Sequence, residues 1–433
     1  MIVKLVVASI LTGLISGIFI TFYELLITFL TYFIYMGNPF ETIPTLPVWY
    51  IYLVPTVSIF IVNYLISKDK HIREYAVTEI ADSISENRMR LTFRTLFLKI
   101  IASALSLASG FAVGTEGPSA GIGAMIAWHI HRLFRLPQML VKMIISVGAS
   151  SGIAAIFVSP ITGMAFAIEN IAYQFLRQYI GYLILASVLA FSVSLHFLEP
   201  VVFKHAAGRL IQLEYLVPVL LFIPFITFFV YLYLFLKKKI LHFIDLELFK
   251  KFNRYRHYLF ALIGGGTIGT ILLLNPHAGF AGKFVVSYLI NDEHQISVLL
   301  IFSVLLLRIV ATTVSIYANA VGGIFLPLMS IGAMTGFMFA EILIKFYHFQ
   351  IEPFYFAAIG AAVFMGVLMK LPFTAVVLAL ETTFDYNVVV ATGIVVVLVT
   401  YLSNLSFKIN KRQVTEADKI TEPLKKSTET EKE

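Results

Sequence analysis

The chain has 433 residues, of which 59% are hydrophobic and only 13% are charged. Soluble domains carry roughly 25% charged residues, so this composition indicates a membrane protein. The sequence contains no cysteine, which excludes disulfides, thiolate metal sites and cysteine nucleophiles. The net charge of +7 comes from basic residues in short loops, which is typical of cytoplasmic loops and argues against a nucleic-acid partner.

Long apolar segments predict that the chain crosses the membrane several times. The windows 143–168, 215–236 and 386–407 contain no charged residue, and each exceeds the ~20 residues that span the hydrocarbon core. Residues 75–98 are amphipathic and basic, which indicates an element at the membrane edge, and 100–113 are apolar and small. In chain order, the expected helices cover 5–36, 48–67, 118–133, 138–157, 160–178, 179–197, 213–236, 257–274, 296–316, 327–346, 353–369, 372–384 and 387–406.

Two motifs recur along the chain and indicate an internal duplication. Gly-Thr-Glu-Gly-Pro at 114–118 returns as Gly-Ile-Phe-Leu-Pro at 323–327, and the small residues that follow recur at the same offset of 209. The segment 160–169 reappears as 372–381, at an offset of 212. Two motifs in the same order at nearly the same offset favour duplication over chance. Duplicated apolar halves with Gly/Pro-interrupted segments at matching positions are typical of transporters.

The duplication predicts one membrane domain made of two halves. We expect a first membrane repeat over 1–200 and a second over 201–407. Residues 408–433 are polar and rich in Lys, Glu and Thr, which predicts a disordered tail. The largest basic connector, around 237–256, is placed in the cytoplasm by the positive-inside rule.

Two glycine loops precede apparent helix starts at Pro118 and Pro327. Glycines such as Gly117 and Gly323 let backbone N–H groups converge without obstruction by side chains. A helix N-terminus with unpaired N–H groups and a positive dipole end can bind an anion. One such loop alone would be interpreted as a simple helix break, but its recurrence in both halves favours an anion site. Such a site binds the anion without a full positive charge, so the anion is held weakly enough to be released.

Glu116 lies inside the first glycine loop, within an apolar region. A carboxylate at this depth costs about 2.5–3.5 kcal/mol, so its presence needs a reason. One interpretation is a titratable gate, which occupies the anion site when ionised and leaves it when protonated. The other is a cap of the helix that starts at Pro118, stabilised by the same dipole. The two are compatible, since such a gate is a cap that can leave.

Four segments together resemble the CLC chloride channel and transporter family, of the prokaryotic type without C-terminal regulatory domains. They are Gly-Thr-Glu-Gly-Pro at 114–118, Gly-Gly-Ile-Phe-Leu-Pro at 322–327, Gly-Ile-Ala-Ala-Ile-Phe-Val-Ser-Pro at 152–160 and the segment from Pro372 to Thr383. The resemblance covers about 5–407. It implies an all-α polytopic fold of two inverted-topology repeats with broken helices, and a homodimer with a separate pore in each subunit.

The resemblance also implies site residues. The gating glutamate of the family falls on Glu116, and the backbone N–H groups that hold chloride fall on Ile324 and Phe325. The family's first motif, which supplies an anion-coordinating serine, has no copy here, and Tyr75 stands at the serine position. A tyrosine hydroxyl can donate to an anion, but Tyr75 can equally be a space-filling side chain. The pore-lining tyrosine of the last helix has no match.

The proton path departs from the family as well. Proton-transporting members often carry an internal glutamate where this chain has Asn170. An amide does not exchange a proton at physiological pH, so either coupling is lost or water or the neighbouring Glu169 serves instead. Glu169 is matched by Glu381 in the second half, which favours a structural role at a helix end.

These observations predict a membrane protein that moves chloride, gated by Glu116, either as a proton/chloride exchanger or as an uncoupled channel. Its partners would be chloride, protons if transport is coupled, lipid and a second subunit, and no cofactor is expected. The expected location is the prokaryotic inner membrane, with both termini cytoplasmic. The alternatives are a carrier of fluoride or nitrate and a cation-coupled solute carrier. An intramembrane enzyme is not expected, because the sequence has no His-Glu-x-x-His, paired-aspartate or Gly-x-Ser-x-Gly arrangement.

Overall fold

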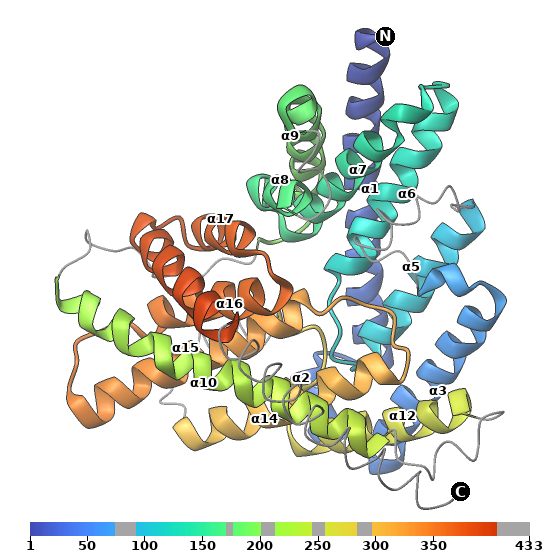
Figure 1. Ribbon diagram of the computed structural model, residues 1–433. Coiled ribbons are helices and arrows are strands. Elements are labelled where there is room, and N and C mark those ends of the chain that lie inside the picture. Colours follow the sequence, from blue (N-terminus) through green and yellow to red (C-terminus); the bar gives the residue numbers. More distant parts are fainter. Residues whose placement is uncertain (74–91, 170–175, 201–212, 245–255, 284–296, 405–433) are drawn as a thin grey trace, which may run out of the picture.

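The computed structural model is built of helices throughout the part of the chain that it describes (Figure 1). An isolated antiparallel bridge joins Gly114 to Gly323, and the described residues form no sheet. The all-α prediction is therefore confirmed. The described residues are 1–73, 92–169, 176–200, 213–244, 256–283 and 297–404.

The helices follow the predicted order. Those of the first half are α1 (Ile2–Ile34), α2 (Pro39–Thr42), α3 (Val48–Lys68), α5 (Phe93–Ala108), α6 (Glu116–Leu133), α7 (Val141–Phe157), α8 (Pro160–Ala167) and α9 (Leu176–Ser194). Those of the second half are α10 (Leu213–Ile244), α12 (Arg256–Leu274), α14 (Val298–Tyr317), α15 (Phe325–Tyr347), α16 (Pro353–Met369), α17 (Pro372–Thr383) and a last helix, Tyr386–Asn404.

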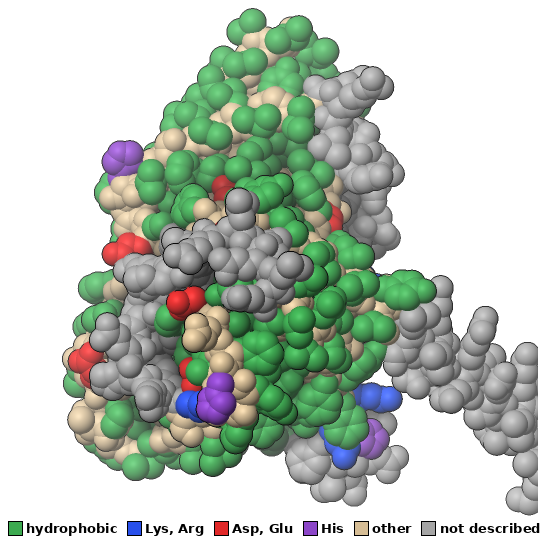
Figure 2. Space-filling view, turned by 90° about the vertical axis from the view of Figure 1, so that its left-hand side faces the viewer, with side chains coloured by type: hydrophobic (Ala, Val, Ile, Leu, Met, Phe, Trp, Pro, Cys, Tyr) green, Lys and Arg blue, Asp and Glu red, His purple; other side chains and the backbone are tan. Residues whose placement is uncertain are grey.

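Within the described residues, seven helices are long and apolar enough to cross a membrane. On the face that Figure 2 shows, hydrophobic side chains predominate among the described residues, and few charged side chains lie among them. On α10, for example, Phe228 and Phe235 are more than half exposed. Side chains of this kind are stable against lipid or another apolar surface and costly in water.

The two halves contain the same helix pair. In the first half α6 packs along α7, and in the second α15 packs along α16. Gly123 faces Gly148 in the first pair and Gly332 faces Gly360 in the second, and a Cβ on any of them would overlap the facing backbone. Close helix approach through small residues is the usual packing in lipid, where the hydrophobic effect does not drive helices together. The halves also contact each other, since α12 packs along α3.

The helices next to the glycine loops begin earlier than predicted. α6 begins at Glu116 and α15 at Phe325, so Pro118 and Pro327 occupy the third helical position and not the first. Proline is tolerated there because the first N–H groups of a helix have no intrahelical partner. By contrast, α8 and α17 begin at Pro160 and Pro372, as expected.

Two other boundaries differ. α5 begins at Phe93, inside the segment expected at the membrane edge, because the Thr92 hydroxyl caps it by accepting a hydrogen bond from the Thr95 N–H at 3.2 Å. α8 ends at Ala167 and residues 168 and 169 continue as π-helix, while 170–175 lie outside the described residues and α9 begins at Leu176, so the helix expected over 160–178 is tested only in part. The rest of the membrane-edge segment, 75–91, and the polar tail, 408–433, lie outside the described residues.

Candidate anion site between the two glycine loops

The glycine loops of the two halves meet and form a two-stranded contact. The Gly114 N–H donates to the Gly323 carbonyl and the Gly323 N–H donates to the Gly114 carbonyl, each at 2.7 Å. These glycines are 209 residues apart, which is the offset of the duplication. The contact therefore joins equivalent positions of the two halves, and it brings the N-termini of α6 and α15 together.

The Glu116 carboxylate lies on the N-terminus of the other half's helix. Its Oε1 accepts hydrogen bonds from the Phe325 N–H at 2.5 Å and from the Leu326 N–H at 3.4 Å. The side chain is 3% exposed. Two amides and the positive end of the α15 dipole therefore hold a buried negative charge, which is the environment of an anion-binding helix N-terminus.

One of the two amides expected to bind chloride donates a hydrogen bond to the Glu116 carboxylate. Phe325 is one of the two residues to which the family resemblance assigned chloride-binding amides, and it is the nearer donor to Glu116. Leu326, the second donor, was not expected, although its place one residue into the helix follows from the helical start at Phe325. Within the described residues, the Ile324 N–H does not donate to Glu116, so the chloride-binding role of Ile324 stays a prediction.

The main contribution of the loop glycines is space for the Glu116 carboxylate, and not hydrogen-bond donors to it. The Gly323 N–H is already bonded to Gly114, and a Cβ on either of these glycines would overlap the Glu116 carboxylate. A Cβ on Gly117 would lie 3.1 Å from the Gly323 Cα. Only glycine permits this approach of backbone and carboxylate, which explains the residue type at these positions.

The other carboxylate oxygen of Glu116 has a different environment. Glu116 Oε2 is buried and has no hydrogen-bond partner among the described residues. An ionised carboxylate with one unsatisfied buried oxygen is poorly compensated on that side. This oxygen is the atom at which a proton can be added without breaking a hydrogen bond to α15.

Two aromatic rings pack against Phe325 and close one side of the site. Phe157, at the end of α7, lies 4.9 Å from the Phe325 ring between centroids, and Phe166 of α8 lies 6.2 Å away with its ring steeply inclined to that of Phe325. Phe325 is fully buried. The rings hold the first residue of α15 in place and give the site an apolar wall with low local dielectric, which strengthens the amide–carboxylate interaction.

Two serine hydroxyls, one from each half, accept hydrogen bonds from backbone N–H groups of the glycine loops. Ser106 of α5 accepts a hydrogen bond from the Val321 N–H, and Ser315 of α14 accepts one from the Ala112 N–H, both at 3.0 Å. Each serine thus binds the loop of the other half. Neither residue was expected from the sequence, although they are themselves 209 residues apart and an alignment of the two halves by that offset pairs them.

Glu169, considered above as a proton-path residue, caps a helix of the other half. Its carboxylate accepts hydrogen bonds from the N–H groups of Phe373 and Thr374 at 3.0 and 2.8 Å and from the Thr374 hydroxyl at 2.7 Å, at the start of α17. This is a helix-end role of the kind favoured from the sequence. Asn170 and Tyr75 lie outside the described residues, so their roles stay predictions.

Arg308 places a buried positive charge beside α15. Its guanidinium is fully buried and donates to the Ser330 hydroxyl of α15 at 2.5 Å and to the carbonyls of Gly279 and Phe280 at 2.7 and 3.2 Å. The Phe280 N–H in turn donates to the Gly110 carbonyl at 3.0 Å, just before the first glycine loop. Arg308 therefore connects α15 to the segment that supports the loop of the other half.

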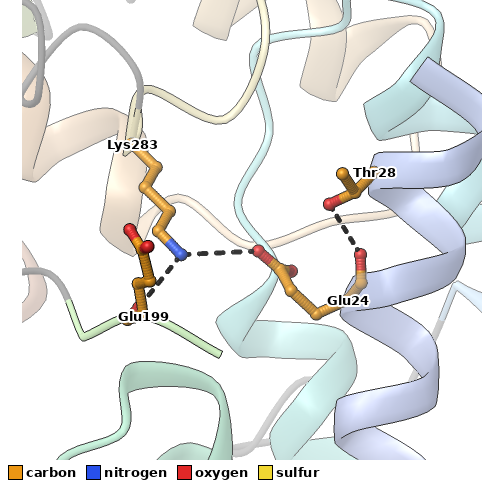
Figure 3. Close-up of polar contacts among 4 residues, drawn as sticks. All are labelled: Glu24, Thr28, Glu199 and Lys283. Carbon is orange, nitrogen blue, oxygen red and sulfur yellow. Dashed lines mark hydrogen bonds and ion pairs between the residues drawn. The ribbon is translucent and has the colours of Figure 1, made fainter. Parts of the chain in front are cut away.

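Another carboxylate lies on the long apolar helix α1 and is partly exposed. Glu24 of α1 is 3.9 Å from the Lys283 ammonium, which also donates to the Glu199 carbonyl at 3.3 Å (Figure 3). The Thr28 hydroxyl binds the Glu24 backbone carbonyl at 3.1 Å, one helical turn along α1. Glu24 is thus placed beside a cation and not on helix N–H groups, which separates its environment from that of Glu116.

Comparisons with known proteins agree with this geometry. The family model for voltage gated chloride channels matches residues 56–404. The chain is 26% identical over 402 residues to the H(+)/Cl(-) exchange transporter ClcA of Vibrio cholerae, covering 88% of this chain and 82% of that protein. In fold it is similar to a slow cyanobacterial Cl-/H+ antiporter, with a TM-score of 0.81, 20% identity and coverage of 93% and 94%. A CLC-type fluoride/proton antiporter gives a TM-score of 0.72 at 21% identity, with coverage of 93% and 95%.

Proposed function

The chain belongs to the voltage gated chloride channel family, and from this membership we propose that it moves chloride across the membrane through the site that Glu116 occupies. One observation carries the proposal: the Glu116 carboxylate, an anion supplied by the first half, is bound by the amides that start α15 in the second half. A group that binds a carboxylate oxygen through N–H donors and a helix dipole binds a dehydrated halide by the same interactions.

The gate works by competition for these amides. While Glu116 is ionised, its own oxygen is the bound anion and the site is closed to others. Protonation removes the charge that the α15 dipole and the amides stabilise, so the side chain is held less tightly and a chloride ion takes its place. The buried Oε2, which has no partner among the described residues, is the oxygen that receives the proton.

Two transport modes are compatible with such a gate. In an exchanger, each proton that reaches Glu116 is carried across the membrane in exchange for chloride. The names of the ClcA relatives and of the cyanobacterial antiporter state proton–chloride exchange for those proteins. In an uncoupled pathway, the proton returns to the side from which it came. The structure supports Glu116 as the proton acceptor in both modes. Glu169 is not proposed for this role, because its carboxylate already accepts hydrogen bonds from the N–H groups at the start of α17.

We further propose that the protein is an integral protein of a prokaryotic cell membrane, with cytoplasmic termini, and a homodimer with one site per subunit. The membrane-crossing helices and the bacterial relatives support the location. The proposed halves, 1–200 and 201–407, are supported by the reciprocal contacts at the duplication offset. The activity is transport and not catalysis, and it needs no cofactor.

The test uses purified protein in liposomes loaded with chloride under an outward gradient, with chloride release and external pH recorded together. The expected result is chloride efflux in wild type that becomes independent of pH in Glu116→Gln. Proton uptake in a fixed ratio to chloride identifies an exchanger, and its absence an uncoupled pathway. Absence of chloride efflux in wild type would overturn the proposal, and parallel assays with fluoride and nitrate would then identify the transported anion.

A further inference from the structure

The hydrogen bonds that Ser106 and Ser315 accept form a crossed pair around the glycine bridge. Ser106 lies on α5 of the first half and binds the second glycine loop at Val321, while Ser315 lies on α14 of the second half and binds the first loop at Ala112. Both serines are fully buried. Each bound amide is two residues before a bridging glycine, Gly114 or Gly323.

With the two bonds of the glycine bridge, the loops are therefore joined to the opposite half at four points. All four bonds run between halves, and they follow the two-fold relationship of the duplication. Ala112 is four residues before Glu116, and Val321 is four residues before Phe325. The position of the carboxylate relative to its amide donor thus depends on a short backbone segment whose other end is held by a serine of the opposite half.

We propose that Ser106 and Ser315 are positioning residues for anion transport, which hold the two glycine loops in register and thereby set the fit between an anion and the α15 amides. The proposal rests on the function proposed above. It adds two residues that do not contact the anion but act on its binding through the backbone.

The neighbouring hydroxyls show that this is not the general behaviour of buried serine and threonine in these helices. Within the described part of the chain, the hydroxyl of Ser109, the residue that caps the end of α5, donates only to the carbonyls of Leu105 and Ser106, and that of Thr313 on α14 donates only to the carbonyl of Ile309. Such bonds stay within one helix and join nothing else. Ser109 and Thr313 are therefore matched controls, from the same two helices and similarly close in sequence to the loops.

The first experiment measures backbone exchange. Hydrogen–deuterium exchange with mass spectrometry is recorded on the detergent-purified full chain for Ser106→Ala, Ser315→Ala and the controls Ser109→Ala and Thr313→Val. Removal of an acceptor leaves a buried N–H without a partner, which destabilises the local structure. We expect a crossed result: Ser106→Ala raises exchange in 319–324 of the second half, and Ser315→Ala raises it in 110–114 of the first. Exchange that rises only around the substituted helix, or equally in the controls, would overturn the proposal.

The second experiment measures chloride affinity by calorimetry and chloride flux in liposomes. Each alanine variant is expected to lose about three- to tenfold in chloride affinity, the size expected for one lost hydrogen bond. The fold-loss in chloride affinity of the double alanine variant is expected to be smaller than the product of the two single losses, because both hydrogen bonds hold the same glycine bridge. Ser106→Thr and Ser315→Thr keep a hydroxyl and are expected to restore the affinity that alanine removes.

The outcomes separate this inference from the proposed function. If wild type transports chloride and the alanine variants bind chloride as wild type does, the serines only support the fold and the inference fails. A drop in thermal stability with unchanged chloride affinity likewise means that the inference fails. If wild type moves no chloride, the proposed function itself fails, while the crossed exchange pattern still tests whether the serines position the loops.

Discussion

Glu169 and Glu381 cap each other's helices across the two halves. Glu169 follows α8 and accepts the N–H groups of Phe373 and Thr374 at the start of α17, while Glu381, near the end of α17, accepts those of Ile161 and Thr162 at the start of α8 at 2.9 and 2.5 Å. The Ser159 and Thr162 hydroxyls complete the second cap. Since Phe166 of α8 packs on Phe325, the two glutamate caps also hold the apolar wall of the candidate anion site in place.

Neutralising either cap is expected to destabilise the fold. Glu169→Gln and Glu381→Gln each weaken two or more charge-assisted hydrogen bonds at a helix N-terminus, worth about 1.5–3 kcal/mol apiece. Thermal unfolding in detergent measures the loss. Glu341→Gln is the control, because Glu341 forms an i,i+4 pair with Lys345 and such pairs contribute about 0.3–0.5 kcal/mol. Equal effects of all three variants would contradict the capping role.

Acidification is expected to increase anion flux in wild type. A lower pH raises the neutral fraction of Glu116, and the neutral side chain competes less with chloride for the Phe325 amide. Glu116→Gln is neutral at every pH, so its flux should not depend on pH over the range in which wild type responds. Chloride efflux measured over the acidic to neutral range tests this prediction, and a pH dependence that survives in the glutamine variant would show that another group is the gate.

Gly323→Ala is expected to abolish normal gating. The added Cβ would overlap the Glu116 carboxylate and lie 3.0 Å from the Gly117 nitrogen, so the carboxylate is expelled or the bridge opens. Gly266→Ala of α12 is the control, because nothing lies within 4 Å of its Cβ and alanine is favoured over glycine in a helix by about 1 kcal/mol. Flux and pH dependence are compared for the two variants, and wild-type behaviour of Gly323→Ala would contradict the close approach.

Glu24→Gln is expected to leave the pH dependence of transport unchanged. Glu24 pairs with Lys283 at 3.9 Å in a partly exposed contact, which contributes about 0–1 kcal/mol to stability. It does not bind the N-terminus of α15, so it does not compete with the anion. Loss of the acid response in this variant would assign the gate to Glu24 and not to Glu116.

The fold could be predicted well from the sequence because the signals are strong and local. Charge-free windows marked helices such as α10, and the recurrence at an offset of 209 marked both glycine loops. The exact helix starts were wrong by two residues at Pro118 and Pro327, because proline is accommodated anywhere among the first unpaired amides of a helix.

The site could be predicted only in outline. Glu116 and the Phe325 amide were predicted as site residues from the family motifs, but the motifs do not say that the carboxylate of one half binds the helix of the other. Ser106 and Ser315 were missed because a serine in an apolar helix most often bonds to its own helix, and only the three-dimensional pairing of the loops shows their acceptor role.

The Glu116 carboxylate and chloride are proposed to compete for the same amides at the start of α15, and this competition is tested most directly by calorimetry. Chloride is titrated into detergent-purified wild type and Glu116→Ala at neutral pH. Removal of the competing carboxylate is expected to increase chloride affinity or to add a binding site, and acidification should increase chloride binding in wild type alone. Identical chloride binding by the two proteins at neutral and acidic pH would contradict the competition.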